Sequence, residues 1–197
     1  MDHDKASARL RLLAALLATK PEERAAWSVA LRAHLLASAA WRAARTVMIF
    51  APLSREPDLL PLFQTNTRLV FPAMEDDCIV PCVVTGEGCL VPGAFRFREP
   101  DRTICPQVPM EEIDLVLVPG LGFGRDGTRL GRGRGHYDRF LKSLPARALR
   151  CGVCFQSQVS DSLPVDSHDV TMHRLLTEGG LTDCGITSAL PAPENGA

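Results

Sequence analysis

The residues best suited to chemistry lie between Pro119 and Arg139, in the stretch PGLGFGRDGTRLGRGRGHYDR. Seven of the 15 glycines fall between Gly120 and Gly135, and eight Lys or Arg stand against two Asp from Gly120 to Arg150. Glycine lets backbone N–H groups turn towards an anion without Cβ clashes, and the arginine guanidinium offers planar donors that match phosphate oxygens. This composition predicts a binding site for a polyanion.

Two familiar phosphate-binding patterns do not explain this stretch. The P-loop pattern G-x-x-x-x-G-K-[ST] does not occur. Gly131, Gly133 and Gly135 are not followed by an acidic residue at the spacing of a dinucleotide site. A flexible basic loop, with Asp126 and Gly127 as a simple turn, is the remaining alternative. The regular alternation of glycine and arginine, followed at once by ring side chains and an acid, favours the anion site.

The elements around this stretch predict how it is positioned. It follows the clearest buried strand, at residues 113–118, and precedes a helix expected at 137–144, which is where α/β sheets place phosphate groups. Apolar runs and helix-forming segments predict helices at 4–18, 21–40 and 57–63, and further strands at 46–50, 67–71, 79–84 and 149–155. Strands that alternate with helices indicate a single α/β domain over residues 1–187, with a mainly parallel sheet flanked by helices and an N-terminal helical pair. The Pro-, Ala- and Gly-rich tail at 188–197 is expected to be disordered.

Composition excludes several classes of protein. The chain has 197 residues, which suits one domain, and 22 Lys and Arg against 23 Asp and Glu give a net charge of −1. This balance of charges argues against a protein that coats nucleic acid and against one that binds a membrane surface. No apolar run approaches the roughly 20 residues that are needed to cross a bilayer. Arg9 and Arg11 interrupt the first apolar residues, so a signal peptide is not indicated. We expect a cytoplasmic monomer without nucleic-acid or membrane partners.

The seven cysteines could be buried thiols or metal ligands. An odd number without an export signal argues against a disulfide framework. Cys151 and Cys154 have the spacing of a zinc or redox pair, but they lie in an apolar run whose successive side chains would face opposite sides of a strand. We therefore expect reduced thiols in the core rather than a metal site.

The glycine-rich stretch also carries a family resemblance. Leu117–Phe123 and Arg129–Arg139 closely resemble the signature of the 5-formyltetrahydrofolate cyclo-ligases, roughly PGLAF-D-x-x-G-x-RLG-x-G-x-GYYDR. A match of this length is far more specific than a Gly-x-Gly pattern. Other features of the family follow in order between about residues 4 and 180: Lys5 and Arg9, Glu56, Glu99–Pro100, Phe155-x-x-Gln158, Leu163–Pro164 with His168–Asp169, and Thr177–Glu178.

The resemblance implies an α/β enzyme that uses Mg-ATP to close 5-formyltetrahydrofolate into 5,10-methenyltetrahydrofolate, with release of ADP and phosphate. The formamide oxygen is a poor leaving group, and transfer of the γ-phosphoryl group of ATP to it would make an imino-phosphate that the folate N10 can attack. Such a transfer depends mainly on positioning and charge neutralisation. ATP and 5-formyltetrahydrofolate are thus the implied substrates, and Mg²⁺ is the implied cofactor.

The same resemblance assigns roles to individual residues. Arg134 and Tyr137 are implied in catalysis, and Asp138 and Asp169 as oxygen ligands of Mg²⁺. The implied contacts with ATP come from Lys5, Arg9, Arg129, Gly131, Arg132, Gly133, Arg134 and Gly135, and those with the folate from Glu56, His136 and Tyr137. Taken alone, Lys5 and Arg9 could form a solvated face of a helix, Glu56 could be a surface acid, and Asp138 could cap the following helix.

Three positions depart from the family pattern. His136 stands where an aromatic residue is usual, Phe95–Phe97 where a Gly-Ile pair is usual, and His173 where an acid is common. All three are expected on the folate side of the site, so the substrate is less firmly indicated than the nucleotide. A paralogue that phosphorylates another formamide or amide therefore stays open. A non-catalytic RNA-binding module is disfavoured, because only 6% of the residues are aromatic and Tyr137 alone adjoins the basic loop.

Overall fold

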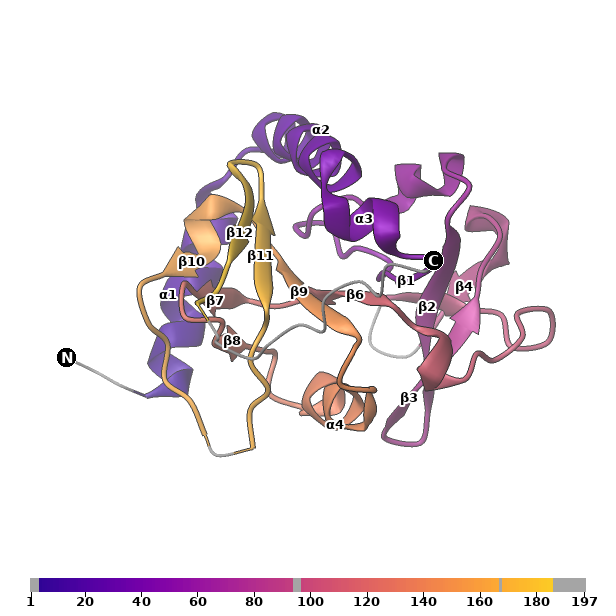
Figure 1. Cartoon of the computed structure of the whole chain (residues 1–197). Coiled ribbons are helices and arrows are strands. Elements are labelled where there is room, and N and C mark those ends of the chain that lie inside the picture. Colours follow the sequence, from indigo (N-terminus) through magenta and orange to yellow (C-terminus); the bar gives the residue numbers. More distant parts are fainter. Residues whose placement is uncertain (1–3, 94–96, 167, 186–197) are drawn as a thin grey trace, which may run out of the picture.

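A seven-stranded sheet forms the centre of the molecule, with the strand order β12-β11-β9-β6-β1-β2-β3 (Figure 1). The computed structural model describes residues 4–93, 97–166 and 168–185. The five inner strands run parallel, and the antiparallel strands β3 and β12 form the two edges. The strands are β1 (Thr46–Met48), β2 (Arg68–Glu75), β3 (Cys78–Val83), β6 (Leu115–Pro119), β9 (Leu149–Val153), β11 (Arg174–Thr177) and β12 (Gly180–Asp183). The predicted α/β fold with a mainly parallel sheet is confirmed.

Helices cover both faces of this sheet, which is why its inner strands are apolar at successive positions. Val47, Leu115 and Leu117 pack in one core with residues of α2 (Pro21–Ala37) and α3 (Ala39–Ala43). Met48, Val116 and Val118 point the other way, into a second core that includes residues of α4 (His136–Ser143). Figure 1 shows α2 and α3 on one side of the sheet and α4 on the other.

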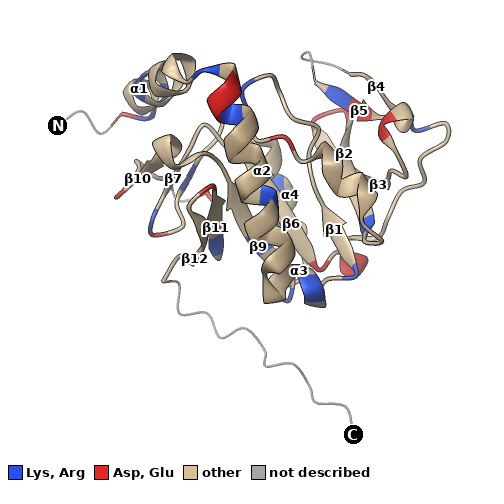
Figure 2. Cartoon of the chain, turned by 90° about the horizontal axis from the view of Figure 1, so that it is seen from above, with Lys and Arg blue, Asp and Glu red and all other residues tan. Residues whose placement is uncertain are grey.

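The first helix, α1 (Lys5–Ala18), belongs to a different layer from α2. Ala8 and Leu12 pack against Leu130 and Leu163, beside a small sheet of β7 (Gly122–Gly124), β8 (Arg129–Leu130) and β10 (Val159–Ser160). A Cβ on Gly122 would lie 2.4 Å from Leu12 Cδ1, so glycine allows the close approach of the helix. Seen from above, α2 lies across the central strands, whereas α1 stands beside β7 and β10 (Figure 2). The predicted N-terminal helical pair is confirmed, and its two members support different sheets.

The remaining elements are short. The helix expected at 57–63 is a 3-10 helix at Leu60–Gln64. Other single turns of 3-10 helix occur at Glu87–Cys89, Met110–Glu112 and Gln156–Gln158, and β4 (Leu90–Pro92) pairs with β5 (Arg98–Pro100). Residues 186–187 of the expected domain and the expected disordered tail at 188–197 lie outside the described residues.

The cysteines are free thiols, and most are buried. Cys151 belongs to the core under α2 and Cys154 to the core under α4, so the two side chains face opposite sides of the sheet, as expected. Burial raises the pKa of both thiols, which favours the protonated form. The expectation of core thiols is wrong for Cys78, which is exposed, and for Cys89, which is half-buried.

Among the described residues, every helix is too short or too polar to span a bilayer.

Candidate active site

The topology of the sheet opens a crevice between β1 and β6. From β1 the chain builds outward to β2 and β3, and from β6 it builds the opposite way to β9, β11 and β12. Connections that leave in opposite directions make a binding crevice at the carboxyl ends of the two neighbouring strands. A cavity of about 670 Å³ lies here, lined by Phe50 and Ala51 after β1 and by Pro119 and Gly120 at the end of β6.

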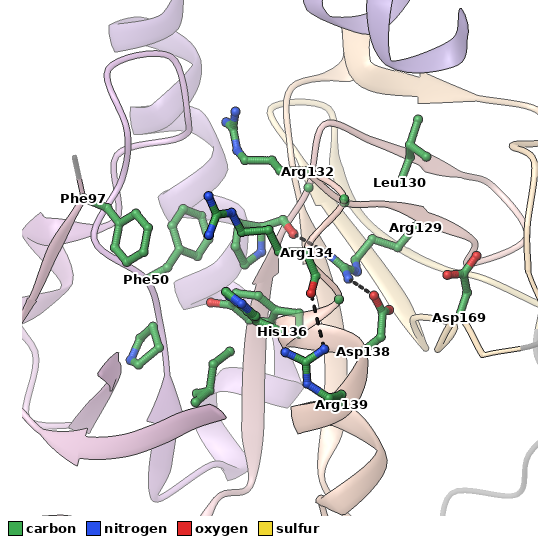
Figure 3. A pocket seen from close by; sticks show the side chains of 18 of the residues that line it. Phe50, Phe97, Arg129, Leu130, Arg132, Arg134, His136, Asp138, Arg139 and Asp169 are labelled. Carbon is green, nitrogen blue, oxygen red and sulfur yellow. Dashed lines mark hydrogen bonds and ion pairs between the residues drawn. The ribbon is translucent and has the colours of Figure 1, made fainter. Parts of the chain in front are cut away.

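Two kinds of side chain line the cavity. Apolar and aromatic groups come mainly from the β1–β3 half of the sheet, whereas most of the cations come from α1, α4 and the loop before α4. Figure 3 shows Phe50 and Phe97 on one side, with Arg129, Asp138 and Asp169 on the other. The apolar lining comprises Phe50, Ala51, Leu53, Pro72, Met74, Ile79, Phe97, Pro119, Leu130 and Tyr137, and the basic lining comprises Lys5, Arg9, Arg98, Arg129, Arg132, Arg134, Arg139 and Lys142.

The loop of residues 131–135 has a backbone that requires glycine at two positions. Gly133 has φ +98° and Gly135 has φ +69°, and an L-residue is strained in this left-handed region. Gly135 stands at the N-cap of α4, so the open N–H groups of the first helical turn begin where the loop ends. Arg9 Nε donates to Gly131 O at 3.1 Å and Arg139 Nη1 donates to Arg134 O at 3.3 Å. The loop is therefore held from α1 and from α4.

Lys5 reaches across the cavity from α1 to an acidic segment. Its Nζ donates to Asp166 Oδ2 at 2.7 Å and to Asp169 Oδ2 at 2.5 Å, and Asp166 N donates to Asp169 Oδ2 at 2.8 Å. Burial lowers the pKa of Lys5, but the two carboxylates outweigh burial and leave the pKa raised above its ordinary value. Burial also raises the pKa of Asp169, but the contacts with Lys5 and the hydrogen bond from the backbone N–H of Asp166 outweigh burial and leave this pKa lowered. Both groups therefore stay charged at neutral pH.

Asp138 is paired with Arg129 and does not cap its helix. Arg129 Nη2 donates to Asp138 Oδ2 at 2.9 Å, and only 5% and 15% of the two side chains are exposed. The guanidinium also lies 5.7 Å from the ring centre of Tyr137, within cation–π range. Gly135 occupies the N-cap, so the alternative assignment of Asp138 as the cap is wrong. Arg129 Nε and the Tyr137 hydroxyl are buried without a hydrogen-bond partner within the described structure.

Glu56 and His136 each bind a neighbouring group. Arg132 Nη2 donates to Glu56 Oε1 at 2.8 Å, and Leu53 N donates to Glu56 Oε2 at 3.0 Å. His136 Nε2 lies 3.6 Å from Asp77 Oδ1, at the turn between β2 and β3. Arg139 Nη2 donates to Asp77 O at 2.7 Å, so this turn is fixed to the first turns of α4.

The structure brings every sequence-predicted site residue to this one cavity. Their individual roles remain predictions. Asp138 and Asp169, predicted to share one Mg²⁺, are bound to different cations. Asp166, His168 and Asp169 offer ligand atoms within 4.8 Å of one another, and the carboxylate oxygens of the two aspartates suit a hard cation such as Mg²⁺.

Sequence reasoning missed several lining residues and misplaced one. Arg139 and Asp166 were not singled out, although Arg139 lies one turn after Gly135 and Asp166 lies three positions before Asp169. Of the three departures, His136 and Phe97 line the cavity, and Phe95 lies outside the described residues. The expectation for His173 is wrong, because it lies near the amino ends of β9 and β11 and contacts Arg150.

Comparison with known proteins places this geometry in a family. The chain matches the model of the 5-formyltetrahydrofolate cyclo-ligase family over residues 1–178. A 5-formyltetrahydrofolate cyclo-ligase of Mycolicibacterium smegmatis is 34% identical over 142 residues, which cover 68% of this chain and 73% of the relative. The structure of Aquifex aeolicus 5,10-methenyltetrahydrofolate synthetase superposes with a TM-score of 0.83 at 30% identity, covering 97% of this chain and 98% of the other. A 5,10-methenyltetrahydrofolate synthetase from Mycoplasma pneumoniae shares the fold, with a TM-score of 0.71 at 21% identity over 89% of this chain and 99% of the other. This protein therefore belongs to the 5-formyltetrahydrofolate cyclo-ligase family.

Proposed function

We propose that this protein converts 5-formyltetrahydrofolate and ATP into 5,10-methenyltetrahydrofolate, ADP and phosphate. The observation that carries the proposal is the division of one cavity into a basic side and an apolar, aromatic side. A polyphosphate matches the basic side, and the flat pterin ring of a folate matches the apolar side. The two substrates would then meet where the loop of residues 131–135 faces Phe50 and Tyr137.

The proposed reaction has two steps whose atoms balance. The formyl oxygen attacks the γ-phosphorus of ATP, and the bond to the departing ADP oxygen breaks. N10 then attacks the formyl carbon and loses its proton, and the former formyl oxygen leaves within the phosphate. The first step needs positioning and charge neutralisation more than covalent help from the protein. Lys5, Arg9 and the arginines of the loop would supply both, with Arg134 facing the transferred phosphoryl group.

Tyr137 would act through its neutral hydroxyl. Burial is the largest cause that raises its pKa, followed by the nearby Glu56 carboxylate, so the phenol keeps its proton at neutral pH. Its hydroxyl is buried without a partner within the described structure, and its ring centre lies 5.7 Å from the Arg129 guanidinium. Such a hydroxyl is suited to donate a hydrogen bond to a bound substrate, and it is unsuited to act as a base.

The donor set fits Mg²⁺. Asp138 and Asp169 line the cavity, and Asp166 and His168 lie beside Asp169. Carboxylate oxygens and phosphate oxygens are the ligands that Mg²⁺ prefers, and the ion would neutralise charge on the phosphates of ATP. Lys5 and Arg129, which hold Asp169 and Asp138 in this structure, would then become available to the phosphate oxygens.

The proposal is tested by following methenyltetrahydrofolate absorbance with purified protein, Mg-ATP and 5-formyltetrahydrofolate. We expect one ADP for each methenyl product and no ATP turnover when the folate is omitted. ATP turnover that does not require 5-formyltetrahydrofolate would contradict the assignment. Product formation with another formamide, but not with this folate, would show a paralogue that shares the fold and phosphorylates a different substrate.

A further inference from the structure

Three acids of the cavity are each paired with a cation that is predicted to bind phosphate. Asp169 is paired with Lys5, Asp138 with Arg129, and Glu56 with Arg132. The third pair differs from the others because it joins the two sides of the cavity. Glu56 follows β1 on the side predicted to hold the folate, and Arg132 lies in the loop predicted to hold the nucleotide.

The two members of this pair are unequally buried. The Arg132 side chain is 47% exposed, whereas that of Glu56 is 8% exposed. Glu56 Oε2 keeps the backbone N–H of Leu53 at 3.0 Å, and Oε1 accepts from Arg132 Nη2 at 2.8 Å. If the guanidinium turns to a phosphate, Oε1 is left in a buried position without this donor. A buried acceptor without a hydrogen-bond partner is unfavourable in free energy until another donor reaches it. If a folate N–H group approaches Oε1 first, Arg132 must be displaced.

We propose that the Arg132–Glu56 pair couples the two substrates, so that each binds more tightly when the other is present. This inference rests on the proposed function for the identity of the two ligands. Whichever substrate binds first must break the pair, and the second substrate finds its partner already released. The free energy needed to break the pair is therefore spent once, by the first substrate, and not again by the second. Because coupling between two sites is reciprocal, nucleotide and folate must raise each other's affinity by the same factor.

The size of the effect follows from measured couplings between binding sites. Such couplings are typically about 5- to 150-fold, and a single partly exposed pair belongs near the lower end. We expect the affinity for 5-formyltetrahydrofolate to rise about tenfold when a non-hydrolysable ATP analogue with Mg²⁺ is bound.

The sharpest test uses the nucleotide alone. Glu56→Gln keeps an oxygen that can accept from Leu53 N but removes the charge that holds Arg132. The affinity for the Mg-bound ATP analogue, measured by calorimetry without folate, should therefore rise several-fold. The matched control is Glu75→Gln, which removes a carboxylate bound to Arg102 at the same distance of 2.8 Å outside the cavity lining. The control should leave nucleotide affinity unchanged.

A second variant tests the coupling itself and does not depend on the folding of the first. Arg132→Gln changes a half-exposed side chain and leaves Glu56 without its cation. We expect 5-formyltetrahydrofolate to bind this variant at least as tightly as the wild type in the absence of nucleotide. The nucleotide should then change folate affinity by less than about twofold, compared with about tenfold in the wild type.

These outcomes separate the coupling from the proposed function. If Glu56→Gln leaves nucleotide affinity unchanged, or if the tenfold effect survives in Arg132→Gln, the coupling role of the pair is wrong. If the wild-type protein binds the nucleotide but not 5-formyltetrahydrofolate, the proposed function fails, and the nucleotide measurement on Glu56→Gln still tests whether the pair restrains Arg132.

Discussion

The two ends of the central sheet use arginine in different ways. At the carboxyl ends of β1 and β6, arginines line a cavity and pair with carboxylates that line the same cavity, Arg129 with Asp138 and Arg132 with Glu56. Near the amino ends, Arg147 Nη1 donates to Asp114 Oδ1 at 2.7 Å, while Asp114 Oδ2 accepts from the backbone N–H groups of Arg45 and Thr46. There the Asp114 carboxylate joins the starts of the neighbouring strands β1 and β6, and Arg147 neutralises its charge.

This difference shows that an arginine's location at the carboxyl or the amino ends of the strands, rather than the number of nearby arginines, decides whether it lines the cavity or stabilises the fold. Arg134 and Arg147 belong to the same basic stretch of the sequence, and the sequence indicates a solvated side chain for Arg147. Arg147 is indeed about half exposed, and it also binds Asp114 and the carbonyl of Glu111. The two residues therefore provide a direct test of the comparison.

The largest expected effect is the loss of activity in Arg134→Ala. Removal of a charged contact with phosphate typically costs about 1.5–3 kcal/mol, which lowers kcat/KM about tenfold or more. Arg147→Ala removes a half-exposed ion pair and should lower stability by up to about 1 kcal/mol with little change in activity. Steady-state kinetics and thermal melting of both variants check the contrast. Equal losses of activity would show that the loop is not the phosphate site.

The next effect concerns Asp138 and Asp169, and it distinguishes metal binding from ion pairing. If both carboxylates bind Mg²⁺, either change to Asn should raise the Mg²⁺ concentration for half-maximal activity, because the amide lacks the negative charge that a hard cation prefers. Asp138→Asn should also lower stability by roughly 1.5–3 kcal/mol, since Arg129 is buried and loses its charged partner. Asp169→Asn should have a smaller effect on melting, because Lys5 keeps Asp166. An unchanged Mg²⁺ requirement in both variants would mean that the metal is held by ATP and water.

The last expected effect concerns stability alone, as a pH dependence near the amino ends. Arg150 N donates to His173 Nδ1 at 3.1 Å, and burial, followed by the charges of Arg150 and Arg174, lowers the pKa of His173 to about 4. The unfolded chain takes up a proton near pH 6.5, whereas the folded protein does so only near pH 4. Stability from this group is therefore complete above pH 6.5 and declines as the pH falls towards 4.

Melting temperatures measured between pH 7.5 and pH 4.5 check this effect. His173→Gln removes the titrating group, so its melting temperature should fall less steeply with pH than that of the wild type. Parallel curves for the two proteins would show that the titration of His173 contributes nothing to the acid sensitivity of the fold.

Much of the fold could be predicted because its central strands have a simple pattern. The strand expected at 113–118 is β6 (Leu115–Pro119), and because its side chains alternate between two cores, residues 115–118 are all apolar. The helices α1, α2 and α4 begin within one residue of their expected starts. The strands β7, β8 and β10 were not predicted, because strands of two or three residues in a glycine-rich segment carry no periodic signal.

The candidate site could be predicted as a set of residues but not as a set of contacts. A motif fixes which residue types come together in a loop, and all of the predicted residues do line the cavity. It does not reveal that Arg132 binds Glu56, 76 positions away, or that Lys5 binds Asp169, 164 positions away. These pairs depend on the topology that brings α1 and the segment after β1 to the same crevice.

The separation of α1 from the two main cores has a consequence for local opening. The apolar cluster that α1 joins contains four buried residues, whereas the central sheet lies between two much larger cores. Segments with few apolar contacts open at a lower free energy than the whole domain, so the amide protons of α1 should exchange with solvent faster than those of β6. Lys5 and Arg9 of α1 line the cavity, so if they bind the nucleotide as proposed, a bound nucleotide would stabilise the closed helix by mass action. Saturation with nucleotide should therefore slow amide exchange in α1 more than in the strands, which makes this helix an internal reporter of occupancy.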